Sequence, residues 1–352
     1  MRISVTPDRV VGVAALVFAV LAPVILSTYW VSALLTQMLF LGIVAVSLIF
    51  LNAYGGMVSL AQVSIFGIAG FVLGNVTTNG NTKGMNLGWS PWLGVVLGIG
   101  IATVAALLFG ALASRSVGIY FLMITLTYSV IANLFFGQVT SVSGFGGISG
   151  ISAPGLVGNV DAHPNRLYYI ALVTAFAVYV ALRYVLRTPF GLSLQGLRDD
   201  PIRMSSLGYA VAWHRTIAFG FAGFIAAIGG VLFVWWNGHI DPASIDLTAT
   251  IDVLVIAVIG GLYRLEGAWV GALFFVIINN YSERISFVGE RFHTLIGAIF
   301  LVIVLVSPGG LIGLWERLLG LLSGRRRGPV DRLPIEVGRT EPTAEGGLPA
   351  RG

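Results

Sequence analysis

The chain has 352 residues, of which 57% are hydrophobic and only 10% are charged, and its formal net charge is +5. This composition is typical of a membrane protein rather than of a soluble domain. Because the chain contains no cysteine, disulfides, thiol catalysis and cysteine-ligated zinc or iron–sulfur sites are excluded. In so apolar a chain, the enrichment of basic residues on the cytoplasmic side of membranes explains the positive charge better than binding to nucleic acid does.

Apolar blocks follow one another along the chain. The first, residues 10–26, resembles a signal peptide in length, but Pro23 and the absence of a small-x-small cleavage pattern favour an uncleaved first span. The later blocks occupy residues 31–51, 57–76, 91–113, 118–136, 167–186, 215–235, 249–262, 266–282 and 292–307. Since roughly 20 apolar residues cross the hydrocarbon, we predict an all-α, polytopic transmembrane helix bundle with about ten spans, some short or broken, within residues 1–310.

Arginine predicts the orientation of the bundle, because Lys83 is the single lysine. The positive-inside rule places both termini in the cytoplasm, with Arg2, Arg9, Arg115, Arg183, Arg187, Arg198, Arg203, Arg215, Arg264, Arg317 and Arg325 to Arg327. The outer side then keeps Lys83, Arg166, Arg284 and Arg291. In the second region, residues 311–352, we expect an amphipathic segment from Leu311 to Leu322 and then a disordered tail.

Two predicted outer loops have their own composition. Residues 76–90 are rich in asparagine, threonine and glycine, and residues 137–166 are rich in glycine and serine. Such loops either pack on a partner, cover a pore or serve as flexible connectors, and the sequence leaves these alternatives open.

A long polar segment, RTPFGLSLQGLRDDPIRMSSLGY from Arg187 to Tyr209, separates two apolar blocks. Asp200-Pro201 is typical of a helix N-cap followed by proline, and Gly208 stands where a left-handed C-terminal cap belongs. The predicted helix has about two turns, too short to be stable alone in water, so we expect the loop 187–214 to dock on a partner. Its docking residues would be an apolar patch and charges of both signs: Leu194, Leu197, Ile202 and Leu207, with Arg198, Asp199, Asp200 and Arg203.

Two Gly-Gly turns, Gly55-Gly56 and Gly260-Gly261, join apolar blocks at an offset of 205 residues. Paired, glycine-interrupted hydrophobic segments point to a substrate path, and we expect hinges at both turns. Neutral polar residues in the spans are candidates for lining that path: Asn52, Tyr54, Ser59, Gln62, Ser64, Asn133 and Asn279. The alternative is that they join helices to one another by hydrogen bonds.

No pattern of an enzyme is present. A phosphate-binding P-loop needs Gly-Lys-Ser/Thr, whereas Lys83 stands between Thr82 and Gly84. The four histidines, His163, His214, His239 and His293, have no partner at the spacing of metal ligands. We therefore expect no catalytic residues, no metal and no cofactor, so that any ATP hydrolysis must come from another subunit.

The polar segment, together with His214-Arg215-Thr216-Ile217-Ala218-Phe219 and Ala226 to Gly230, resembles the cytoplasmic loop and following span of branched-chain amino acid ABC permeases of the LivM-like type. Asn52 to Gln62 and Ile259 to Ala268 resemble the glycine-rich turns of that family. The resemblance implies an importer subunit in the bacterial inner membrane that works with a second permease, two ATPase subunits and an extracytoplasmic solute-binding protein. The polar segment would be the coupling helix that contacts an ATPase.

Three alternatives remain open on the sequence. Related permeases move urea, short amides or sugars, and Gly146-Gly147-Ile148 is only a loose version of the family's outer loop, so the substrate does not follow from the motif. An ion-coupled secondary carrier is a second alternative, although such carriers usually bury carboxylates or histidines in their spans. A membrane protein with a purely structural role is the third.

Overall fold

The computed structural model describes residues 17–79, 84–151, 153–158, 164–282, 292–307 and 309–314. Of the predicted first span, residues 10–26, the structure describes the part from residue 17 onward, where residues 17–25 are helical. The predicted disordered tail lies outside the described residues. The amphipathic segment that we predicted after Pro308 is described only as far as Leu314, where the chain is helical.

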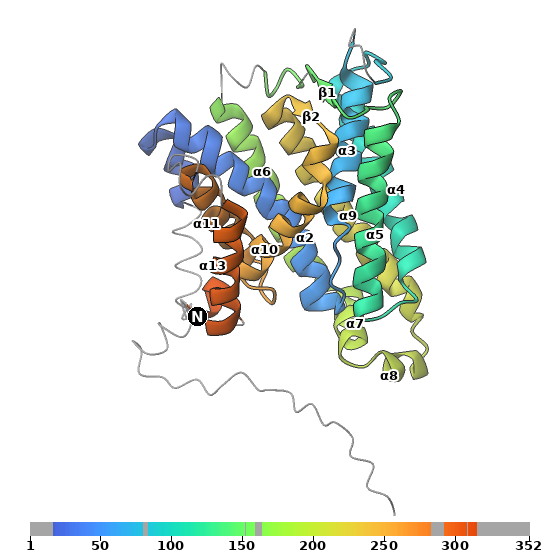
Figure 1. Cartoon of the computed structure of the whole chain (residues 1–352). Helices are drawn as coiled ribbons and strands as arrows, with labels where there is room; N and C mark the ends of the chain where they lie inside the picture. Colours follow the sequence, from blue (N-terminus) through green and yellow to red (C-terminus); the bar gives the residue numbers. More distant parts are fainter. Residues whose placement is uncertain are drawn as a thin grey trace, which may run out of the picture. The chain divides into compact units, whose positions relative to one another are not determined.

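The described chain is almost entirely helical (Figure 1). Its elements are η1 (Trp30–Leu35), α2 (Thr36–Gly55), α3 (Gln62–Thr77), α4 (Pro91–Ala113), α5 (Ile119–Gln138), β1 (Ile148–Ser149), α6 (Pro164–Val185), α7 (Pro189–Asp199), α8 (Pro201–Ser206), α9 (Val211–Asn237), β2 (His239–Ile240), η2 (Pro242–Ile245), α10 (Leu247–Gly260), α11 (Gly267–Ser282) and α13 (Phe292–Val306). Among the described residues, five helical segments are long and apolar enough to cross a membrane, and three shorter apolar helices accompany them. The predicted helical membrane bundle with short and broken spans is confirmed.

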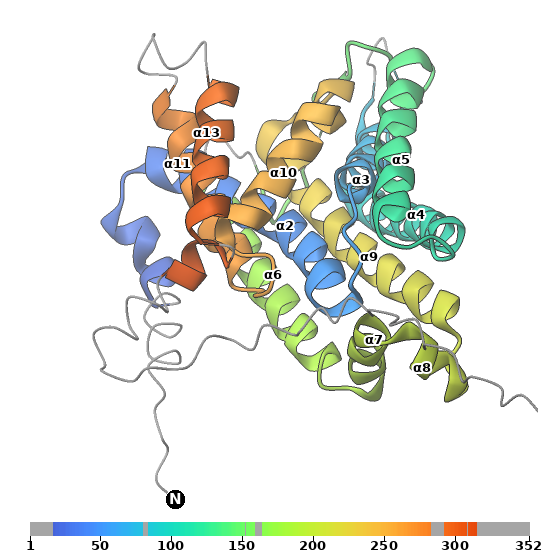
Figure 2. The same ribbon diagram turned by 60° about the horizontal axis from the view of Figure 1, so that its bottom comes forward.

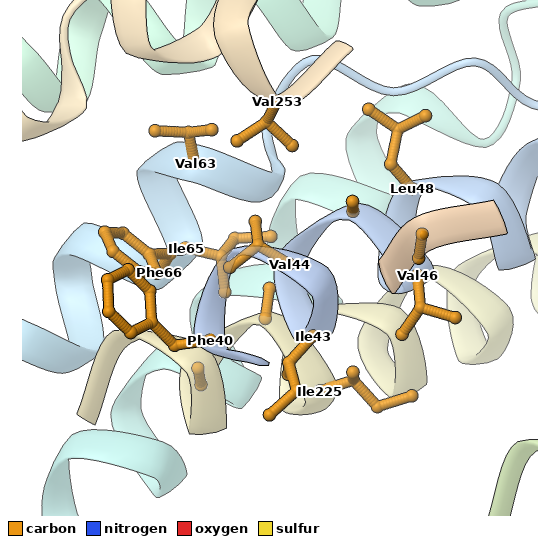
Figure 3. Close-up of a cluster of buried hydrophobic side chains, with 14 of the residues drawn as sticks. Phe40, Ile43, Val44, Val46, Leu48, Val63, Ile65, Phe66, Ile225 and Val253 are labelled. Atoms are coloured by element: carbon orange, nitrogen blue, oxygen red, sulfur yellow. The ribbon is translucent and has the colours of Figure 1, made fainter. Parts of the chain in front are cut away.

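The centre of the bundle is formed by α2 and α9, which pack against each other and against α3, α4 and α11. In the most hydrophobic windows of η1–α2 and α9, 78% and 72% of the residues are buried, compared with 22 to 28% in α4, α5 and α6. Apolar side chains of α2, α3, α9 and α10 meet in the cluster of Figure 3. The outer helices therefore present apolar side chains to their surroundings, as lipid-facing helices do.

Glycine allows α9 to approach its neighbours closely. A Cβ atom on Gly229 would lie 2.8 Å from Val44 Cγ2 on α2, and one on Gly230 would lie 2.9 Å from the carbonyl carbon of Phe66 on α3. Small residues at helix contacts are the usual means of packing helices in membranes, where lipid provides no hydrophobic drive for association.

The glycine-serine loop, residues 137–166, contacts the rest of the bundle through the strand β1. Its strand β1 pairs antiparallel with β2, with Ile148 opposite Ile240 and Ser149 opposite His239. Ser149 Oγ lies 2.9 Å from His239 Nδ1. Gly147 has a φ of +66°, and a Cβ atom there would lie 2.8 Å from Asp241 Cβ, so this turn requires glycine. Of the alternatives for this loop, a flexible connector does not describe residues 148–149.

Candidate functional site: a coupling hairpin and a broken-helix path

Two short helices, α7 and α8, lie together at one end of the bundle, below α2 and α9 in Figure 2. We call this the α7–α8 end. Seven of the eight arginines in the described residues lie at helix ends or links on this side, namely Arg115, Arg183, Arg187, Arg198, Arg203, Arg215 and Arg264. Arg166 lies at the start of α6, at the opposite end of this helix from Arg183. The distribution of charge is the one that the orientation prediction requires.

The cap predicted for α8 is present. Asp200 Oδ1 accepts hydrogen bonds from the backbone N–H groups of Ile202 at 3.1 Å and Arg203 at 2.9 Å, and proline follows the cap. At the other end, Gly208 has a φ of +88°, and Tyr209 N donates to Met204 O. An Asp-Pro start and a glycine stop thus delimit a helix of six residues.

The sequence analysis missed α7. This helix starts with the same signal, because Thr188 Oγ1 accepts from Gly191 N and Pro189 occupies the first turn. The predicted short helix between Asp200 and Gly208 is confirmed as α8, but α7 precedes it, so the loop is a helical hairpin. The Thr188-Pro189 pair, together with the four-residue spacing of Phe190 and Leu194, was the signal that could have found it.

The predicted apolar patch is divided between two surfaces. Leu194 and Leu197 are fully buried against the chain's own bundle, whereas Ile202 and Leu207 are 80% and 67% exposed. The prediction of a single patch is wrong for the two buried leucines, because α7 turns its apolar face toward α2 and α9. No residue of α8 is buried. On and beside α8, the exposed surface of the hairpin includes Ile202 and Leu207 with the charged side chains of Asp200 and Arg203, and Leu192 is exposed on α7.

Arg198 is directed at the end of α2, although its side chain remains 39% exposed. Its Nη1 atom donates to the carbonyl of Ala53 in the last turn of α2, and its Nε and Nη2 atoms lie 2.9 and 2.8 Å from Asp199 Oδ1. Gly56, which ends α2 in a left-handed conformation with a φ of +65°, lies directly against this side chain. A Cβ atom on Gly56 would lie 2.8 Å from Arg198 Cγ. The first Gly-Gly turn and the hairpin formed by α7 and α8 are therefore in contact.

The second Gly-Gly turn lies beside the first. Asn52 Nδ2, one turn before the end of α2, donates to the carbonyl of Leu262 at 3.2 Å. Around this turn the backbones of α10 and α11 touch, since a Cβ atom on Gly260 would lie 2.5 Å from the carbonyl carbon of Gly267. Gly261 has a φ of +124°, which favours glycine. The internal similarity in the sequence thus corresponds to two neighbouring turns.

A cluster of Tyr179, Arg183 and Glu266 joins the segment after the second Gly-Gly turn to α6. Tyr179 Oη donates to Glu266 Oε1 at 2.6 Å, and Arg183 forms an ion pair with the same oxygen. Burial by itself would raise the pKa of Glu266, but the hydrogen bonds from Tyr179 and the backbone, together with the charge of Arg183, lower it below its ordinary value. Glu266 therefore remains a carboxylate at neutral pH. Its pairing with Tyr179 and Arg183 was not predicted from the sequence.

Between α2 and α3, residues 57–61 lie outside both helices, and α3 begins inside the bundle (Figure 1). We call residues 57–61 the break. Ser47 Oγ on α2 donates to Gln62 Oε1, in the first turn of α3, at 3.2 Å. Because Ser47 lies eight residues before the end of α2, this contact places the start of α3 about 12 Å above that end. Helices that begin at such a depth occur in membrane proteins where protein or a solute path satisfies the free backbone.

Several polar side chains at the start of α3 are buried. Ser59, Gln62 and Ser64 are all at most 1% exposed. Ser64 Oγ donates to Ala61 O at 2.7 Å, and Ser59 Oγ accepts from Ala61 N at 3.2 Å. No side chain caps the first N–H groups of α3, and Gln62 Nε2 is buried without a hydrogen-bond partner. A buried donor without a partner costs about 1 to 3 kcal/mol, so this site is suited to an additional acceptor.

A stripe of three polar side chains continues along α5, at a spacing of four residues that places them on one helix face. Thr125 Oγ1 accepts from Leu60 N at 3.2 Å, and Ser129 Oγ lies 2.9 Å from Thr250 Oγ1 on α10. Asn133 Nδ2 donates to Pro242 O at 2.7 Å. These bonds join α5 to the break, to α10 and to η2 in turn.

The predicted path residues do not form one group. Ser59, Gln62 and Ser64 meet at the break, and Asn133 belongs to the stripe on α5. Asn52 and Tyr54 lie at the α7–α8 end of α2, whereas Asn279 lies near the far end of α11, next to Asn280, whose Nδ2 lies 3.4 Å from Gln37 Oε1 at the start of α2. In the described residues, no group of three or more histidines and carboxylates could hold a metal ion.

A bundle of apolar helices with one helix that begins at mid-depth and a hairpin held at one end defines a multi-pass membrane transport permease. The chain belongs to the family described as "Branched-chain amino acid transport system / permease component", whose model matches residues 30–304. The description makes its members permease components of a transport system.

Among curated proteins, the chain is 24% identical over 252 residues to the high-affinity branched-chain amino acid transport system permease protein LivM of Salmonella typhimurium, covering 65% of this chain and 59% of that protein. It is 27% identical over 282 residues to the probable branched-chain amino acid transport permease protein LivM of Methanocaldococcus jannaschii, with coverages of 74% and 81%. A fructose import permease protein, FrcC, of Rhizobium meliloti is 22% identical over 292 residues, with coverages of 80% and 78%.

The chain thus spans about three fifths of the length of the Salmonella relative. No solved structure matches the chain at a significant level.

Proposed function

We propose that this chain is one permease subunit of an ABC importer that moves branched-chain or other apolar amino acids across the inner membrane. A second permease completes the path, two ATPase subunits hydrolyse ATP, and an extracytoplasmic solute-binding protein delivers the solute. Family membership and the coupling hairpin, whose outer helix α8 has no buried residue, support this proposal. The gathering of arginines at the α7–α8 end supports a cytoplasmic location for the hairpin and for both termini.

The break between α2 and α3 is our candidate for the solute site. The uncapped start of α3 carries the positive end of its helix dipole, and such half-helix ends are suited to carboxylates. The unpartnered Nε2 atom of Gln62 adds a donor there. An amino acid presents a carboxylate, whereas urea and sugars present none, so this feature favours amino acids over the sugar suggested by the fructose permease relative.

Transport by the complex is the first test. In proteoliposomes that contain the partner subunits, uptake of leucine, isoleucine or valine should require both the binding protein and ATP on the side of α7 and α8. Competition by unlabelled fructose, urea and acetamide measures the solute class, and preferential uptake of one of these would favour the alternative permease. Uptake driven by a proton or sodium gradient without ATP would contradict the proposal.

Gln62→Leu tests the solute site. We expect amino acid uptake to fall about tenfold, a typical effect of losing one hydrogen-bond donor to a charged group. The subunit should become no less stable to heat, because the variant removes a buried donor that lacks a partner, while Ser47 Oγ, which loses Gln62 Oε1, keeps its 2.6 Å hydrogen bond to Val44 O. If Gln62 only joined α3 to Ser47, stability would fall and uptake per folded complex would not. Gln138→Leu, at the exposed end of α5, is the matched control.

A further inference from the structure

We propose that Arg198 and Asn52 form a mechanical link through which α7 moves both Gly-Gly turns, and with them the break before α3. The inference rests on the proposed function as an ATP-driven importer. It assigns different tasks to the two helices of the hairpin, because α8 is the exposed contact for an ATPase and α7 transmits the movement.

The contact of Arg198 with α2 is a helix cap. The last carbonyl groups of a helix have no partner within it. At the end of α2, Gly56 N donates a hydrogen bond to the carbonyl of Asn52, and Met57 N donates one to the carbonyl of Leu51. The carbonyl of Ala53, the residue after Asn52, accepts a hydrogen bond from the Arg198 guanidinium. A cation at this position also compensates the negative end of the helix dipole.

Asp199 positions this guanidinium. Two nitrogens of Arg198 share Asp199 Oδ1, while Nη1 remains directed at Ala53. The planar fork of arginine holds both partners at once, which the single ammonium of lysine does less well. We had assigned both residues to contact with an ATPase, and the geometry gives them a partner inside the permease.

Packing makes this contact stiff. Leu194 and Leu197 bury α7 against the bundle, and a Cβ atom on Gly56 would lie 3.5 Å from the backbone Cα atom of Arg198. A displacement of α7 therefore has to expose two leucines or carry the end of α2 with it. Tightly packed interfaces transmit displacements in this way because they have few intermediate arrangements.

Asn52 extends the link to the second turn. Its Nδ2 atom binds the carbonyl of Leu262, directly after Gly261, and the ion pair between Arg183 and Glu266 holds the far side of the same turn. The end of α2 is thus bonded to α7 on one side and to the α10–α11 turn on the other. One movement of α7 reaches both hinges through it.

The absence of cysteine in the chain makes the link measurable. Ser59 is fully buried in the break, so Ser59→Cys reports exposure of this segment to a small thiol reagent. The measurement uses the complex with its ATPase subunits in nanodiscs. We expect the rate at which the reagent labels the Ser59→Cys subunit to change about tenfold between the nucleotide-free and the ATP-vanadate states, a typical allosteric coupling. An unchanged rate in this parent would contradict the inference.

Adding Arg198→Gln should reduce the nucleotide-dependent change to less than about twofold, while the ATPase subunits still co-purify. Arg115→Gln, on the exposed α4–α5 link, removes the same charge from the same end and should leave the change intact. A tenfold change that persists in Arg198→Gln would overturn the proposal.

Asn52→Leu provides a second, independent test, which also applies if the Arg198 variant does not assemble. Ala268 is fully buried beside the second turn, so Ala268→Cys reports on that turn. Asn52→Leu should abolish the nucleotide response at Ala268→Cys and preserve it at Ser59→Cys. A preserved response at both positions would contradict the link. ATP-driven uptake by the parent complex is measured separately, so failure of the proposed function and failure of the link give different results.

Discussion

Gly260→Ala should prevent the permease from folding to its native packing, although the change adds a single methyl group. That methyl would lie 2.5 Å from the carbonyl carbon of Gly267 and 3.1 Å from the backbone nitrogen of Gly271. Both obstacles are backbone atoms of α11, which cannot turn aside as a side chain can. Separating the two helices should cost about 3 kcal/mol, a large effect for overpacking. Size-exclusion yield and the thermal stability of the detergent-solubilised subunit measure the loss.

The matched control is Gly100→Ala on α4, where no atom lies within 4 Å of the added Cβ. In a helix interior, alanine is about 1 kcal/mol more favourable than glycine in water, so this variant should be at least as stable as the parent. Equal yields of Gly260→Ala and Gly100→Ala would show that the close approach of α10 and α11 is not required.

Replacing both Ile202 and Leu207 by aspartate should abolish ATP-driven uptake. The two side chains are the exposed apolar residues of the α8 region, and central apolar anchors carry most of the energy of small interfaces. We expect the affinity for the ATPase subunits to fall about 100-fold, because truncation of one such anchor commonly costs 2 kcal/mol or more. Co-purification of the ATPase subunits and uptake in proteoliposomes measure the effect.

The bundle itself should remain intact in this double variant, since α8 has no buried residue. Phe145→Asp with Leu156→Asp is the control, because these side chains are 77% and 68% exposed and lie in the loop that carries β1, away from α8. Retained association in the Ile202 and Leu207 variant would remove α8 from the ATPase interface. Loss of association in both double variants would point to a general effect of added charge.

Much of the fold could be read from the sequence, because a helix that crosses a membrane is apolar along its whole length. The block at residues 91–113 coincides with α4, and α5 begins one residue after and ends two residues after the block at 118–136. The break between α2 and α3 was harder to place. Residues 57–61 are as apolar as their surroundings, and periodicity cannot distinguish a short apolar extended segment from a turn of helix.

The hairpin was only half predictable. Asp200-Pro201 is a strong local signal, and local signals determine where α8 begins. Whether Leu194 and Arg198 face a partner or the chain's own bundle is decided by contacts with α2, about 145 residues earlier, and no local pattern encodes them. The cluster of Tyr179, Arg183 and Glu266 was missed for the same reason, since Tyr179 and Arg183 lie on α6 and Glu266 lies on the distant link between α10 and α11.

The burial of α2 at the centre of the bundle has a consequence for biosynthesis. This helix enters the membrane early, but its main partner α9 is translated about 180 residues later, roughly 10 to 40 seconds at bacterial rates of synthesis. During that interval its surface must be acceptable to lipid. Its apolar residues lie on every side of the helix, so α2 is compatible with a lipid environment before α9 is inserted. The polar side chains of Ser47 and Asn52 are few enough not to prevent this. Ser47 Oγ donates to Val44 O within α2 itself, whereas Asn52 meets its partner Leu262 only when the later segment is inserted.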